Sequence, residues 1–162
     1  MDSSQMQGLV DSHMRAENQG DIDGAVAVYT DDVAHDVIGF PNSPTRSKGR
    51  ARDFYAYLTA NFRTEHWDVL RRYLAEDAIV LEQLMTGTVT GSLLGLPGNG
   101  RRIHFRMLHV FEFRDGLISR ENVWLDSAAV ADPAPAWPCA KTLAMNEVPN
   151  FSERYSKNGH LE

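Results

Sequence analysis

Residues 102–126 read RIHFRMLHVFEFRDGLISRENVWLD, and this stretch decides the fold. Polar and apolar residues alternate on both sides of Asp115-Gly116, which is typical of two antiparallel strands joined by a tight turn. A two-residue turn of type I′ would pair Phe113 with Ile118. A type I turn closed by a left-handed Gly116 bulge would pair Phe113 with Leu117 instead, and every later pair would shift by one residue.

The two turns differ in the side chains that they bring to the face carrying Phe105. The two-residue turn would add Arg120 and Asp126 to this face, whereas the bulged turn leaves it apolar apart from one serine, one histidine and one glutamate. We therefore predict the bulged turn. The face then consists of Phe105, Met107, His109, Phe111, Phe113, Leu117, Ser119, Glu121, Val123 and Leu125. In this register His109 lies directly opposite Glu121, and a histidine facing a carboxylate in an apolar wall is the core of a general acid/base site.

The overall composition indicates a single domain of ordinary size. The chain has 162 residues, which is enough for a hydrophobic core. Its net charge of −6 argues against nucleic acid or an anionic membrane surface as the main partner. No apolar run approaches the length of a membrane span, and the polar N-terminus lacks a signal-peptide pattern. The single cysteine, Cys139, allows no internal disulfide framework and fits a reducing cytoplasm.

The first part of the chain has helical periodicity. Apolar residues and His13 recur at helical spacing over residues 6–14, and Gly20 is placed to end this helix. Asp21 or Asp23 can cap a second helix that runs through residue 29.

A short strand, a third helix and a series of strands follow. The strand spans residues 33–38 and has His35 on the same face as its valines. The third helix carries an apolar stripe over residues 51–62, and further strands cover about 67–74 and 78–89. Helices followed by antiparallel strands predict an α+β fold, with the helices packed on one face of a curved sheet.

The composition changes near residue 131, where prolines become frequent. We predict one domain over residues 1–130 and a Pro-rich C-terminal extension over residues 131–162, whose last two residues resemble a cloning scar. We expect the extension to pack on the body, on a dimer partner or at the pocket mouth, because it contains several large apolar side chains. These are Trp137, Leu143, Met145, Phe151 and Tyr155.

Five short motifs are spread over residues 6–126. They are ENQGDIDG at 17–24, YTDDV at 29–33, TGTVTG at 86–91, GLPGNGR at 95–101 and RDGLI at 114–118. In this order and spacing they resemble the nuclear transport factor 2-like superfamily, and within it the SnoaL-like branch of polyketide cyclases and epoxide hydrolases. The resemblance implies a cone-shaped sheet, mostly antiparallel, wrapped around N-terminal helices, with a deep apolar pocket. It also implies a homodimer and enzymes that use no metal or organic cofactor.

The resemblance also suggests site residues. His109 falls where SnoaL-like cyclases have a pocket histidine, and His35 falls where the related epoxide hydrolases have a pocket tyrosine. Val123 departs from the pattern, because the family has its essential aspartate there and a valine cannot take a proton. Neither aldol cyclisation nor epoxide opening can then run in the usual way. Glu121, one inward step away on the same strand, is a candidate replacement for that carboxylate.

Each candidate also has a structural interpretation. His109 can be a core histidine that donates to a backbone carbonyl, and His109 with Glu121 can be a purely structural pair. A carboxylate on an inward face must be paired, protonated or hydrated, because burying it alone costs several kcal/mol. For His35 the two interpretations are equally good.

The remaining candidates are expected to contact substrate or to lie elsewhere. Glu82 has apolar neighbours on both faces of its strand, and we favour the pocket over an interface. Tyr55 and Tyr57 suit packing in the third helix, and Tyr55 is included as a candidate substrate contact. The expected apolar walls near His109 are Met107, Phe111 and Val123.

Two further groups of residues are not expected to carry chemistry. His104, Arg106 and Trp124 lie on the face opposite His109 and suit a dimer interface. The spacing of His13, His66 and His160 gives no metal site.

These observations predict a cofactor-independent acid/base enzyme for a hydrophobic, aromatic or polycyclic small molecule. His109 would act as base or acid, Glu121 would orient it, and His35 would hold a substrate oxygen. A lyase or dehydratase is the first interpretation. The alternatives are an aldol cyclase, a non-catalytic binding protein and, last, a purely structural interaction protein.

Overall fold

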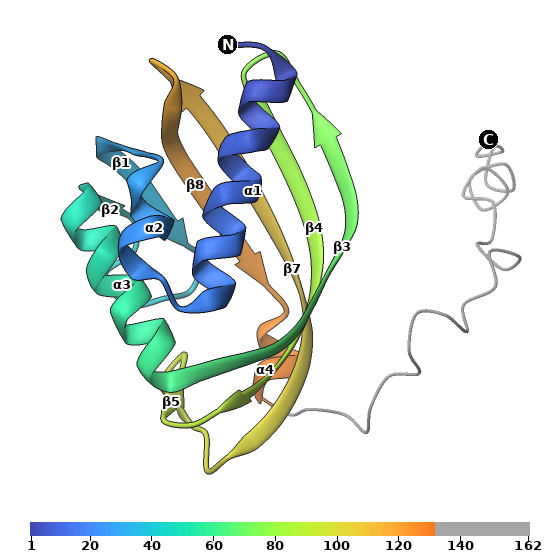
Figure 1. Ribbon diagram of the computed structural model, residues 1–162. Coiled ribbons are helices and arrows are strands. Elements are labelled where there is room, and N and C mark those ends of the chain that lie inside the picture. The colour runs from blue at the N-terminus through green and yellow to red at the C-terminus, as the bar shows by residue number, and fades with distance from the viewer. Residues whose placement is uncertain (132–162) are drawn as a thin grey trace, which may run out of the picture.

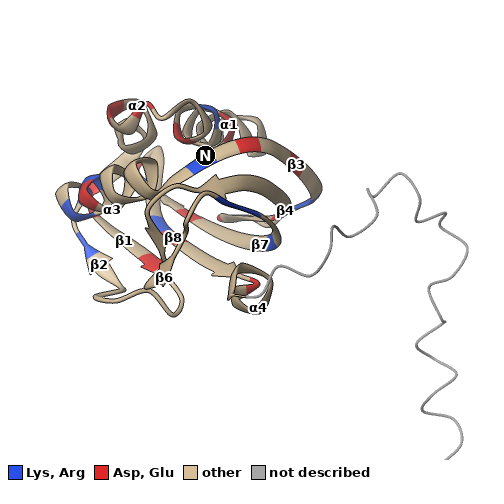
Figure 2. Cartoon of the chain, turned by 90° about the horizontal axis from the view of Figure 1, so that it is seen from below, with Lys and Arg blue, Asp and Glu red and all other residues tan. Residues whose placement is uncertain are grey.

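A computed structural model describes residues 1–131, in which a curved sheet carries helices on one face (Figure 1). The six-stranded sheet has the order β2-β1-β8-β7-β4-β3. Strands β1 and β8 are parallel, and the other neighbouring pairs are antiparallel. Figure 2 shows the sheet curling beneath the layer of helices. The predicted α+β fold is confirmed, whereas the predicted extension lies outside the described residues from residue 132 onward.

The elements follow one another with short connections. In chain order they are α1 Ser3–Gln19, α2 Ile22–Ala27, β1 Tyr29–Val37, β2 Thr45–Arg46, α3 Lys48–Asn61, β3 Phe62–Leu74, β4 Ala78–Val89, β5 Ser92–Leu93, β6 Leu96–Pro97, β7 Arg101–Arg114, β8 Leu117–Leu125 and α4 Ser127–Ala131. No helix in this described part of the chain is both long and apolar enough to cross a membrane.

The ends of the N-terminal helices follow from local side chains. Helix α1 begins after Asp2, whose carboxylate accepts a hydrogen bond from the Gln5 backbone, and it ends at Gly20 with a left-handed φ of 71°. Asp21, rather than Asp23, caps α2 by accepting from the Gly24 backbone. The short α2 ends before residue 29, so the predicted extension of this helix through that residue is wrong.

Strand β1 and helix α3 bring further side chains to the interior. Val33, His35 and Val37 are buried on one face of β1, as their alternation predicts. Helix α3 starts at the Ser47 cap and buries Tyr55 against β1.

The hairpin between β7 and β8 differs from the predicted one. Arg114 pairs with Leu117 and Phe113 pairs with Ile118, so the turn has only two residues, both with positive φ. The predicted Gly116 bulge is therefore wrong.

An irregularity further along β8 restores the predicted faces only beyond Ser119. Before it, Ile118 is buried in the core in place of Leu117 and Ser119, so this part of the predicted face is wrong. The pairing passes from Phe113–Ile118 to Glu112–Arg120, which leaves Ser119 as an extra residue. Beyond this bulge Phe111 pairs with Glu121 and His109 pairs with Val123. His109 and Glu121 consequently share the inward face as predicted, but they are diagonal neighbours rather than direct partners.

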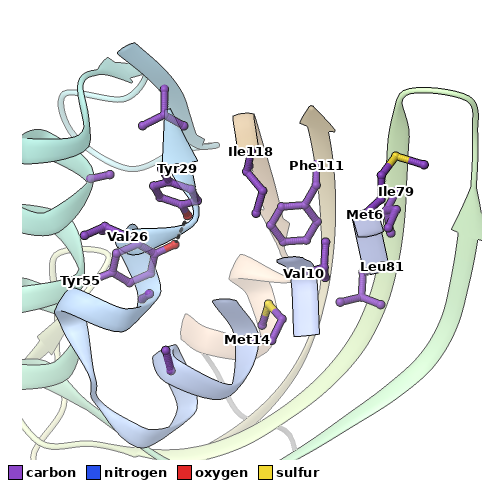
Figure 3. Packing of buried hydrophobic residues seen from close by; sticks show 14 residues of the cluster. Met6, Val10, Met14, Val26, Tyr29, Tyr55, Ile79, Leu81, Phe111 and Ile118 are labelled. Atoms are coloured by element: carbon purple, nitrogen blue, oxygen red, sulfur yellow. Dashed lines mark hydrogen bonds between the residues drawn. The ribbon is translucent and has the colours of Figure 1, made fainter. Parts of the chain in front are cut away.

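Two apolar clusters stabilise the cone. In the first, α1 packs on the sheet, and Figure 3 shows Met14 and Val10 near Phe111 and Leu81. The second cluster surrounds Phe105 at the other end of the sheet. Several of its side chains border the pocket described below.

We predict that Gly87→Ala destabilises the protein. A Cβ at Gly87 would lie 2.3 Å from Cζ of Phe62 and 2.6 Å from the backbone oxygen of Arg63, so the β3–β4 pair would have to shift. Such overpacking costs about 1–3 kcal/mol. Urea unfolding measures this loss of unfolding free energy. Gly8→Ala is the control, because its Cβ meets nothing within 4 Å and a helical alanine should add about 1 kcal/mol. Equal stability of the two variants would contradict the packing argument.

Candidate active site

An apolar pocket opens between the helices and the concave face of the sheet. The space between its walls is about 600 Å³ when the open solvent at its mouth is counted with it. Phe40, Phe54, Phe62 and Phe105 contribute aromatic walls from four different segments. The ionisable side chains of the lining are Glu17, His35, Tyr55, His109 and Glu121, and no Lys or Arg of the described chain lines it.

Glu121 is the centre of the ionisable groups. Its side chain is fully buried, and its Oε2 accepts hydrogen bonds from the hydroxyls of Tyr29 and Tyr55, the latter at 3.1 Å. The same oxygen lies 3.5 Å from Nε2 of His13. Tyr29 and Tyr55 also approach each other, with 2.8 Å between their hydroxyl oxygens (Figure 3). Side chains from β1, α3 and α1 thus converge on one carboxylate oxygen from β8.

His13 and Glu121 form a buried ion pair. Burial alone would lower the pKa of His13, but the Glu121 carboxylate, together with Glu17 and the backbone oxygen of Ala25, outweighs this effect and raises the pKa to about 9. Burial opposes ionisation of Glu121, yet His13 and the other nearby histidines hold the pKa of Glu121 well below its usual range. The second ring nitrogen of His13, Nδ1, lies 2.8 Å from the backbone oxygen of Ala25, to which the imidazolium donates. Near neutral pH, His13 is therefore the cation and Glu121 the anion.

His109 and His35 are neutral by contrast. Burial lowers the pKa of His109 to about 4, because the attraction of Glu121 does not compensate. Nε2 of His109 lies 3.5 Å from Oε1 of Glu121, and the ring stacks on Phe111. Burial also lowers the pKa of His35, whose ring packs against Phe54.

Four buried polar atoms of the pocket-lining residues have no hydrogen-bond partner in the described chain. They are Oε2 of Glu17, Nε2 of His35, Nδ1 of His109 and Oε1 of Glu121. Buried polar atoms are nearly always bonded, so each of these four lacks a hydrogen bond that a water or a bound molecule would supply.

Of the other residues predicted to contact substrate, some line the pocket and others lie outside it. Met107 and Val123 line the pocket, and Val123 lies directly opposite His109. Tyr55 also lines it, although its hydroxyl is bound to Glu121. Phe111 is fully buried behind the His109 ring and does not belong to the lining, so that prediction is wrong.

The prediction that Glu82 faces the pocket is also wrong. Its neighbours Leu81 and Gln83 are buried on the inward face of β4, so Glu82 points outward. There its carboxylate pairs with Arg71 at 3.0 Å and with Arg106 at 3.5 Å. Apolar residues on both faces of β4 concealed its orientation in the sequence.

Three ionisable residues of the site were missed by the sequence interpretation: His13, Glu17 and Tyr29. The sequence could have indicated His13, because a histidine within the apolar stripe of a helix becomes a buried polar group that needs a partner. Tyr29 was assigned to the second helix, and Glu17 appeared only within a motif.

No group of three or more His, Cys, Asp or Glu side chains is arranged to hold a metal ion in residues 1–131. The histidines that surround Glu121 do not converge on a common point with it. Its Oε2 already receives two phenol hydroxyls and the His13 ring.

Similar folds occur in several solved structures. TsrD from Streptomyces laurentii is 20% identical, with a TM-score of 0.69 over 80% of this chain and 94% of that one. An M. tuberculosis LEH-like epoxide hydrolase is 20% identical, with a TM-score of 0.62 over 78% and 86% of the two chains. An NTF2-like protein from Burkholderia thailandensis is 20% identical, with a TM-score of 0.64 over 81% and 96%.

Sequence comparison adds the family. No curated protein matches the chain significantly. The model of the SnoaL-like domain, however, matches residues 10–121, which include the site from His13 to Glu121. The chain therefore belongs to the SnoaL-like domain family and has the nuclear transport factor 2-like fold.

Proposed function

We propose that this protein is a cofactor-independent acid/base enzyme that acts on an uncharged, hydrophobic small molecule, aromatic or polycyclic in shape. One observation carries this proposal: unpartnered buried atoms of His35, His109 and Glu121 meet at the polar end of an otherwise apolar pocket. An apolar pocket with a few convergent polar groups and shifted pKa values is the usual form of such a site.

The charge of the pocket supports an uncharged substrate. Glu121 is already compensated by His13, and the described lining offers no Lys or Arg to an anionic group. A substrate carboxylate or phosphate would therefore be buried without a partner, which costs several kcal/mol. A hydroxyl or a carbonyl can instead bond to the neutral histidines.

His109 suits the role of general base. If its Nε2 proton points toward Oε1 of Glu121, its Nδ1 offers a free lone pair to the pocket. Glu121 would then orient the ring and stabilise the imidazolium formed when Nδ1 takes a proton, from a substrate carbon in elimination or from a substrate hydroxyl in carbon–carbon cleavage. His35 would hold the substrate hydroxyl or carbonyl.

Elimination or carbon–carbon cleavage fits these groups best, so a lyase or dehydratase is the favoured activity. Aldol cyclisation is second, because Val123 presents no carboxylate opposite His109. A binding protein without turnover is the competing class. In that case His109 and Glu121 would only bind the ligand.

Two small ketones test proton abstraction without knowledge of the natural substrate. We expect the protein to accelerate exchange of the α-protons of 2-tetralone in D₂O, measured by NMR. His109→Ala should lower the exchange rate about 10²–10⁴-fold, the usual contribution of a general base. With 4-hydroxy-4-phenylbutan-2-one, a dehydratase gives the conjugated enone and a carbon–carbon lyase gives benzaldehyde and acetone.

His66→Ala is the matched control, since His66 is an exposed histidine outside the pocket. Glu121→Gln should also lower the exchange rate, because the orienting charge is lost. Binding of 2-tetralone without any accelerated exchange would favour the binding-protein alternative. An exchange rate that is unchanged in both pocket variants would refute the roles given to His109 and Glu121.

The ion pair makes a prediction for stability against pH. The pKa of His13 rises from 6.5 in the unfolded chain to about 9 in the folded protein, so its stabilisation is complete below pH 6.5 and is lost as pH rises through 9. We expect the unfolding free energy of the wild type to fall by a few kcal/mol between pH 7 and pH 9. His13→Gln should be less stable at pH 7 and lack most of this slope. Urea unfolding at several pH values measures the unfolding free energy of the wild type and of the variant. If the two free energies change with pH in the same way, a buried imidazolium at His13 is ruled out.

We also propose a homodimer through the outer face of the sheet. Trp124 is 40% exposed and pairs across strands with Leu108, which forms an apolar patch beside Arg106. Trp124→Glu should give a monomer by light scattering, whereas Tyr73→Glu, which alters an exposed aromatic residue on β3, should not. A wild-type monomer, or a dimer that survives Trp124→Glu, would exclude this interface.

A further inference from the structure

We propose that Glu17 is the general acid of this site and that His13 is its positioning residue. The proposal rests on the proposed function and adds to it a donor that protonates the substrate oxygen while His109 removes the proton from carbon. Without such a donor, the hydrogen bond from the neutral His35 would leave the negative charge that develops on that oxygen without a proton to neutralise it.

The position of Glu17 fits this role. It belongs to the last turn of α1, it lines the pocket, and its side chain is 12% exposed. Oε2 of Glu17 is buried, with no hydrogen-bond partner in the described chain. This oxygen lies 3.7 Å from Nε2 of His13, and the same nitrogen lies 3.5 Å from Oε2 of Glu121. One imidazolium therefore stands between two carboxyl groups.

The surroundings favour the neutral form of Glu17 over its carboxylate. Glu121 receives two phenol hydroxyls in addition to His13, whereas Glu17 receives none. Glu17 also lies at the carbonyl end of α1, where the helix dipole disfavours a negative charge. Burial accordingly raises the pKa of Glu17 to about 7, although His13 opposes the shift.

The groups that face Glu17 come from several elements. They are His13 on its own helix, Glu121 on β8 and Tyr55 on α3. The acidic residues of the adjacent α2 segment have other partners, since Asp21 accepts from Gly24 and Asp23 from Arg52. The one carboxylate of β4, Glu82, points to the outer face.

The reaction conserves protons, because His109 takes one from the substrate and Glu17 gives one to it. His109 takes a proton from the substrate carbon, and the C–H electron pair forms the new double bond. In elimination the C–O bond breaks and the oxygen leaves with the proton of Glu17 as water; in ketone exchange that proton goes to the carbonyl oxygen. The resulting Glu17 carboxylate is stabilised by the His13 imidazolium at 3.7 Å. After product release, His109 gives its extra proton to pocket water and Glu17 takes one back.

The test uses 2-tetralone exchange with Glu17→Gln, which keeps the shape of the side chain but carries no transferable proton. We expect the exchange rate to fall about 10²-fold with unchanged affinity for 2-tetralone. The wild-type rate should fall as pH rises through about 7, because the acid must be protonated, and this limb should vanish in Glu17→Gln. Glu76→Gln, at an exposed turn, is the control and should match the wild type.

A second measurement does not depend on activity. Carbon-13 NMR of the side-chain carboxyls should show one buried glutamate that titrates near pH 7, with Glu17→Gln serving only to assign it. An ordinary pKa for Glu17, or an unchanged rate and pH limb in Glu17→Gln, overturns the proposal. If His109→Ala still abolishes exchange in that case, the proposed function stands and only Glu17 is excluded. If His109→Ala also leaves the exchange rate unchanged, both proposals fail.

Discussion

The buried carboxylate of Glu121 is the interaction on which the site depends. A carboxylate removed from water costs several kcal/mol unless its oxygens are bonded and its charge is paired. Here the partners arrive from three other elements: Tyr29 from β1, Tyr55 from α3 and His13 from α1. The docking of α1 and α3 on the sheet is therefore coupled to the satisfaction of this one group. The same contacts that specify the packing also set the electrostatics of the pocket.

Burial, more than the pair of Glu121 and His13, sets the protonation of the other groups. A single imidazolium compensates Glu121, and burial then disfavours any further charge nearby. His109 and His35 remain neutral for this reason, and Glu17 keeps its proton up to a pH of about 7. Differences in burial and in bonding partners thus give identical side-chain types different protonation states.

Much of this arrangement could be predicted from the sequence, but only where the two-residue alternation of a strand fixes which side chains face inward. Alternation correctly placed His35, His109 and Glu121 inward, because successive strand residues face opposite sides. The bulge at Ser119 was not predictable, since Asp-Gly suits both turn types and nothing in the residues marks the extra one. Helical periodicity placed His13 inward, yet its partner depends on how α1 crosses the sheet, which is a tertiary property.

The position of the acid on β8 has consequences for the chemistry. A carboxylate at Val123 would face His109 directly on the pocket wall, free to exchange protons with a ligand. At Glu121 one oxygen is held by phenols and imidazole, so this carboxylate acts as a fixed charge rather than a proton carrier. Under the proposed roles, proton transfer passes to His109 and Glu17. Their pKa values of about 4 and about 7 keep the base neutral and the acid protonated at the same time between those two pH values.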